Sequence, residues 1–154
     1  MDLARFQQIF PEQTFPELSV KSPDAQVGIT ALVHGLDGRW TYTFEGGKLK
    51  WAMFNRYIDE LTQANFDRCL SATDAIIADY TRQYGPPASL KPGTRTFKDP
   101  YDPKVERHWG YEVMEATWKA DGMKFHVDFD FMGGKGDYHF LVQMEFERED
   151  YPYF

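Results

Sequence analysis

Four polar residues in the last third of the chain are candidates for chemistry: His126, Asp128, Asp130 and His139. Residues two apart on a β-strand project from the same face, at a spacing of roughly 7 Å. A hairpin closed by a four-residue loop at 133–136 would place His139 directly opposite Asp130. Imidazole and carboxylate groups bind zinc or iron, and a histidine beside a carboxylate can transfer protons. The pattern therefore predicts a metal site or an acid–base site on this strand pair.

A plain structural explanation competes with this chemistry. Alternate positions of a strand with one wet face are polar in any case. The chain has no HExxH spacing and no GxSxG, CxxC or GxGxxG arrangement, which are the short motifs that carry specific chemistry. The sequence therefore favours a protein that is not an enzyme and that holds no metal and no cofactor.

The alternation that begins near residue 107 predicts three antiparallel strands. A tight turn at Asp121-Gly122 and the loop at 133–136 close the two hairpins. With these turns the large apolar residues meet on one face, and we expect a β-bulge near Gly110. The predicted pairs are Trp118 with Phe125, Met114 with Phe129, Phe129 with Phe140, and His126 with Thr117 and Gln143.

A similar meander is predicted earlier in the chain, over 27–36, 39–45 and 48–55. Asp37-Gly38 and Gly46-Gly47 are turn signals of the type that requires positive φ. They predict that large apolar residues again share one face. The predicted pairs are Val33 with Tyr42, Phe44 with Leu49, Tyr42 with Trp51, and Trp40 with Met53.

Between the two meanders, apolar residues recur at three- and four-residue spacing from Phe66 to Tyr80, which predicts an amphipathic helix. The helix should begin after Thr62 or Asn65, because both residue types are good N-caps. It should end at Gly85, which is followed by two prolines.

These elements predict an α+β fold in a single domain, 1–154, with a largely irregular N-terminal segment at 1–26. The architecture is an antiparallel sheet of two three-stranded meanders, βββ-α-βββ, with one long helix packed on one face. A strongly curved sheet or an open barrel is the competing arrangement. The proline-rich, basic connection at 86–107 is long for a small domain and could contain a short strand at 94–97.

The composition excludes several classes of protein. A net charge of −7 argues against a nucleic-acid partner and against an anionic membrane. No apolar stretch approaches the roughly 20 residues of a membrane-spanning helix. With a single cysteine, Cys69, and no visible signal sequence, we expect a soluble cytoplasmic protein, although an exported protein with its signal removed would have the same features.

The aromatic residues support two interpretations. Core packing is the simpler one, because aromatic rings bury more area than other side chains. The alternative is an apolar ligand pocket, because one helix covers a stripe only about 10 Å wide while six strands span roughly 25 Å. The candidate pocket residues are Trp40, Tyr42, Trp51, Trp118 and Phe129.

The charge itself suggests a function. Residues 112–154 hold ten acids and four bases, a balance of −6 out of −7. Acids and aromatic residues also meet near the end of the chain, as is typical of interfaces. We therefore expect a protein-binding module of the inhibitor, immunity or adaptor type, with a basic protein partner. The candidate binding residues are Glu145, Glu147, Tyr151 and Tyr153.

Overall fold

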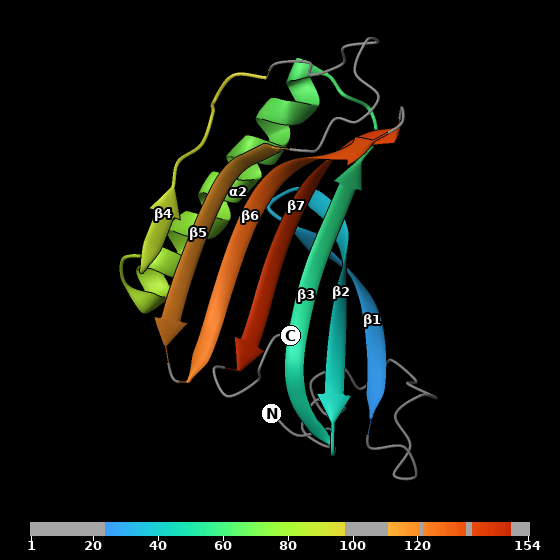
Figure 1. Ribbon diagram of the computed structural model, residues 1–154, viewed down its shortest axis with the longest axis vertical. Coiled ribbons are helices and arrows are strands. Elements are labelled where there is room, and N and C mark those ends of the chain that lie inside the picture. Colours follow the sequence, from blue (N-terminus) through green and yellow to red (C-terminus); the bar gives the residue numbers. More distant parts are fainter. Residues whose placement is uncertain (1–23, 98–110, 121, 135–136, 149–154) are drawn as a thin grey trace.

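The computed structural model of the protein describes residues 24–97, 111–120, 122–134 and 137–148. Its strands form one antiparallel sheet in the order β1-β2-β3-β7-β6-β5-β4, and α2 lies across one face of that sheet (Figure 1). The predicted α+β class with an antiparallel sheet and one packed helix is therefore confirmed. The elements are β1 (Ala25–Val33), β2 (Leu36–Glu45), β3 (Lys48–Ile58), α2 (Gln63–Tyr84), β4 (Ser89–Lys91), β5 (Tyr111–Ala120), β6 (Met123–Gly134) and β7 (Asp137–Arg148).

The helix begins and ends as its sequence predicts. The Thr62 side chain accepts a hydrogen bond of 3.2 Å from the Asn65 backbone N–H, which caps the first turn. Gly85, with a φ of 84°, ends the last turn, and its N–H donates to the Thr81 carbonyl. In the part of the chain that the structure describes, no helix combines the length and the apolar character needed to cross a membrane.

The connection after α2 forms a strand at a different place from the predicted one. β4 pairs with β5 through Ser89, Leu90 and Lys91, which extends the sheet by a seventh strand. The predicted strand at 94–97 is wrong, because this segment turns back toward the helix. There the Arg95 guanidinium holds both carboxylate oxygens of Asp74, at 2.9 and 3.0 Å.

The first hairpin turns three residues earlier than predicted. His34 and Gly35 have φ values of 46° and 80°, as a tight two-residue turn requires, and Val33 pairs with Leu36. The turn lies against α2, where His34 Nε2 is 2.9 Å from Asp79 Oδ2 and Arg68 donates to the Gly35 carbonyl. The predicted turn at Asp37-Gly38 is therefore wrong.

A bulge changes the face of β3. Glu45 pairs with Lys48 and Phe44 with Leu49 as predicted, but the register then shifts by one residue, so that Thr43 pairs with Trp51. A shift of one residue moves every later side chain to the other face. The predicted pairs of Tyr42 with Trp51 and of Trp40 with Met53 are therefore wrong, and their place is taken by Ala52 and Phe54.

In the second meander the β5–β6 pairs are confirmed, and the β6–β7 register differs by two residues. β6 continues to Gly134 and β7 begins at Asp137, so Phe129 pairs with Val142 instead of Phe140. Each side chain keeps its predicted face of the sheet, because a register shift of two residues does not change the alternation. The predicted bulge residue Gly110 lies outside the described residues, and the irregularity of β5 lies between Glu112 and Met114.

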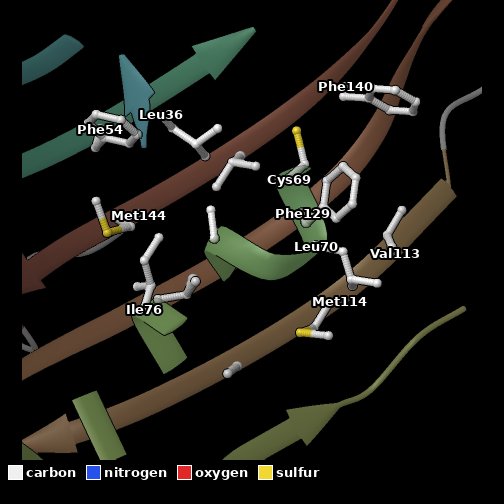
Figure 2. Packing of buried hydrophobic residues seen from close by; sticks show 14 of the residues in the cluster. Leu36, Phe54, Cys69, Leu70, Ile76, Val113, Met114, Phe129, Phe140 and Met144 are labelled. Atoms are coloured by element: carbon white, nitrogen blue, oxygen red, sulfur yellow. The ribbon is translucent and has the colours of Figure 1, made fainter. Parts of the chain in front are cut away.

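The core lies between α2 and strands β5, β6 and β7. In Figure 2, Cys69, Leu70 and Ile76 of the helix point into a layer of strand side chains that includes Phe129 and Met144. Cys69 has no exposed surface, and burial raises the pKa of its thiol to about 11, as expected of a structural cysteine. The Trp118 indole N–H donates to the Gly85 carbonyl at 3.1 Å, which fixes the end of the helix over β5.

Gly38 offers a test of this packing. A Cβ atom at Gly38 would lie 2.3 Å from Cζ of the buried Phe54 ring and 2.7 Å from the Asn55 carbonyl oxygen. We expect Gly38→Ala to lower the free energy of unfolding by about 1–3 kcal/mol, because the ring has no room to move. The measurement is urea denaturation.

Gly28→Ala is the matched control in the neighbouring strand. There the three atoms nearest to the added Cβ belong to the guanidinium of Arg39, a residue that is exposed and can turn away. We expect a change of less than about 0.5 kcal/mol. An equal loss of stability in both variants would show that contact with the Phe54 ring is not the reason why position 38 requires glycine.

Candidate functional site

Strands β5, β6 and β7 separate an inner face against α2 from an outer face turned away from it. Ala116, Val127 and Met144 belong to the core beneath the helix, so the residues next to them in sequence project outward. Six outward residues are carboxylates, and together they form what we call the acidic face: Glu112, Glu115, Asp128, Asp130, Glu145 and Glu147.

The registers arrange the outer face in rows that run across the strands. Directly opposed side chains lie about 5 Å apart. Asp128 occupies the middle row, between one row that contains His126 and another that contains Asp130. From β3 through β7 and β6 to β5, the rows are Met53, Glu145, His126 and Thr117; Asn55, Gln143, Asp128 and Glu115; and Tyr57, Leu141, Asp130 and Glu112.

His126 lies between two carboxylates. Its Nδ1 is 3.9 Å from Glu145 Oε2, and its Nε2 is 3.6 Å from Glu115 Oε1. Interaction with Glu145 raises the pKa of His126 above its usual value, against the opposing effect of burial. Nε2 itself is buried and makes no hydrogen bond.

Asp128 and Asp130 are carboxylates in an unfavourable environment. Asp128 is 8% exposed, and its Oδ1 is buried without a hydrogen-bond partner. Burial raises the pKa of Asp128 to about 7, and nearby carboxylates add to this effect while His126 opposes it. Burial likewise raises the pKa of Asp130 to about 6, with a further contribution from Glu112.

The other carboxylates have donors. Lys91 of β4 binds Glu115 and lies 3.5 Å from Glu112, and its hydrogen bond holds the pKa of Glu115 below the usual range. The Trp51 indole N–H donates to Glu145 at 2.5 Å. In the described segments, no lysine or arginine lies within ion-pairing distance of Asp128 or Asp130.

The predicted pairing of His139 with Asp130 is wrong. With a two-residue connection between β6 and β7, His139 lies opposite Met132, and Asp130 lies opposite Leu141. The His139 ring packs edge-on against Tyr57, with ring centroids 4.9 Å apart. Of the four candidate residues, the structure thus brings together His126, Asp128 and Asp130, and leaves His139 at the end of the sheet.

The surviving cluster does not have the geometry of a metal centre. Among the residues that the structure describes, no three His, Cys, Asp or Glu side chains converge on a point where an ion could be held. The cluster instead combines a histidine with two carboxyl groups whose pKa values are raised, to about 7 in Asp128 and about 6 in Asp130. Such a cluster can accept N–H donors and bind a positively charged group.

The five candidate pocket residues do not line one cavity. Trp118 and Phe129 are fully buried in the core, and Trp40 and Tyr42 pack on each other at the edge of the inner face, with ring centroids 5.8 Å apart. Trp51 was predicted to share their face. The bulge in the β2–β3 pair places it on the outer face instead, where it binds Glu145.

Of the four candidate binding residues, Glu145 and Glu147 lie on the acidic face. Burial raises the pKa of Glu147. Tyr151 and Tyr153 lie outside the described residues. Sequence reasoning missed Asn55 and Trp51 as outer-face residues, because no feature of the sequence marks the bulge that turns them outward.

Comparison with protein-family models, with curated proteins and with solved structures finds no match to this chain.

The raised pKa values make stability depend on pH. An acid with a higher pKa in the folded chain binds its proton more tightly when folded, so stability falls as the pH rises from about 4 through the folded value. For Asp128 that folded value is about 7. The raised pKa of His126 acts in the same direction, because its favourable interactions are lost as the ring deprotonates.

We therefore expect the free energy of unfolding to fall between pH 5 and pH 8. Asp128→Asn should reduce this slope, so that its stability relative to the unsubstituted protein increases by about 1–2 kcal/mol across the window. Denaturant unfolding at several pH values measures it. Asp59→Asn, at an exposed site, is the control, and parallel curves for both variants would contradict the assignment.

Proposed function

We propose that this domain binds a basic protein partner through the acidic face and performs no reaction itself. The observation that carries the proposal is the charge imbalance around Asp128 and Asp130. These two carboxylates are partly or largely buried and project from the same face of β6, and within the described residues His126 is the basic side chain beside them.

An arrangement of this kind lowers the stability of the folded protein when no partner is bound. Burying a carboxylate without a partner costs free energy, because the lost hydration is not replaced. A positively charged partner would supply the missing interactions, and the same charges would accelerate its approach at low ionic strength. The acidic face therefore has the features of a surface that is completed by binding.

The apolar-ligand alternative receives less support. Two of its five residues, Trp118 and Phe129, contribute fully buried side chains to the packed core, and Trp51 belongs to the opposite face. An acid–base enzyme would use His126, but His139 is no longer part of that cluster. Protein binding, by contrast, requires only the acidic face as it is observed.

The test is affinity capture with the purified protein, followed by binding measurements on the captured partner. We expect a basic partner whose dissociation constant rises about tenfold or more between low and high salt, because exposed charges are screened. Reversal of Glu145 and Glu147 to lysine should abolish capture, and the neutral Glu145→Gln, Glu147→Gln variant should weaken it if the reversed protein folds poorly.

Asp59→Lys combined with Glu60→Lys makes the same change of charge away from the acidic face, at two exposed residues that follow β3. This control should retain the partner. Equal loss in both double variants would indicate general electrostatic attraction, and unchanged capture in both would reject the acidic face as the binding surface.

A further inference from the structure

Three of the four buried side-chain atoms that lack a hydrogen bond in the described residues belong to the outer face. They are Asn55 Oδ1, His126 Nε2 and Asp128 Oδ1. Asn55 and Asp128 belong to the same row, on either side of Gln143, and His126 belongs to the adjacent row. The orphaned atoms thus lie within two adjacent rows of the acidic face.

Two of the orphaned atoms share a chemical requirement. The carboxylate oxygen of Asp128 and the amide oxygen of Asn55 both accept hydrogen bonds. Buried acceptors without donors are uncommon in folded proteins, because each costs free energy. The group that would complete this site must therefore bring several N–H donors and a positive charge.

An arginine side chain matches this requirement better than a lysine or a metal ion. Its planar guanidinium presents five N–H groups in a fixed fork, and it is less strongly hydrated than an ammonium group. The two acceptors lie on β3 and β6, on either side of β7, which suits a broad planar donor. A metal ion needs ligands that converge, and the described His, Cys, Asp and Glu side chains do not.

Two lysines of the outer face are already engaged elsewhere. Lys91 binds Glu115 and Glu112 at the β4 edge, and Lys124 lies opposite Glu147 in another row. In the row of Asp128, Arg39 lies opposite Asn55 at one end, with its guanidinium beside Gly28, and Lys91 lies opposite Glu115 at the other end, so neither cation lies beside Asp128. The Asp128 oxygen has little exposed area, and no hydrogen bond fixes its orientation.

The surroundings indicate that the arginine belongs to a protein. The row next to Asp128 contains Tyr57, which is 51% exposed, and Met132 at the end of β6 is 41% exposed. Apolar side chains at the border of a charged site are typical of protein interfaces, in which an arginine is often a dominant contact. A free small cation would not use them.

We propose that the outer face of β3, β7 and β6 is a socket for an arginine side chain of the basic partner, with the guanidinium seated on Asp128 and Asn55. This inference rests on the proposed function, since it names the partner group that the acidic face recognises. His126 borders the socket in the adjacent row, between Glu115 and Glu145.

The experiment is a titration of the full chain with two short peptides, acetyl-Gly-Arg-Gly-amide and acetyl-Gly-Lys-Gly-amide, at constant ionic strength. Nuclear magnetic resonance follows the side-chain amide of Asn55 and the backbone amide of Asp128. We expect the arginine peptide to bind at least about fivefold more tightly than the lysine peptide, because only the guanidinium can reach several acceptors at once.

Asp128→Asn should reduce the affinity for the arginine peptide at least fivefold, whereas Asp59→Asn makes the same substitution at an exposed site and should leave it unchanged. The spectrum of each variant shows directly whether it is folded. Equal affinity for the two peptides, or unchanged arginine binding in Asp128→Asn, would overturn the socket.

The two proposals can fail separately. Loss of the arginine preference together with salt-sensitive capture of a basic partner would overturn the socket and leave the proposed function intact. An arginine preference that depends on Asp128, in a protein that captures no salt-sensitive partner, would support the socket and overturn the proposed function.

Discussion

The pairing of β3 with β7 is the contact on which the rest of the structure depends. It joins two meanders that are separated by the helix into one sheet, with eight residues of each strand in register. Without it, β7 would be an edge strand, and Leu36, Phe54 and Ile58 of the first meander would not join the core. The same pairing places Asn55 and Trp51, from the first meander, beside the carboxylates of the second.

The two faces of this sheet have opposite energetic roles. The inner face stabilises the fold, because Trp118, Phe129 and their neighbours are removed from water beneath α2. The outer face opposes it, because Asp128 and Asp130 are held where their charged forms are disfavoured. Proteins commonly retain such destabilising groups where binding requires them. The large aromatic core supplies the stability that allows this face to remain unsatisfied.

Much of the fold was predictable because its signals are local. The helix boundaries follow from Thr62 and Gly85, whose capping chemistry operates within a few residues. The β5–β6 pairs follow from the tight turn at Asp121-Gly122, since a short turn fixes the register of the strands it joins. The position of the first turn was not predictable in this way. Turns at His34-Gly35 and at Asp37-Gly38 would put the same side chains inward, so the alternation of apolar residues could not distinguish the two turns. The contacts of the turn with α2 select the turn at His34-Gly35.

The sequence by itself determined which residues alternate, where the helix begins and ends, and that the second half of the chain is acidic. It could not determine the order of the strands or which acids have partners, because both depend on contacts between residues far apart in the chain. One extra residue in the β2–β3 pair turned Trp51 outward, and a two-residue shift in β7 exchanged His139 for Leu141 beside Asp130. Such shifts change little in local preference, and only the packing of the whole sheet selects among them.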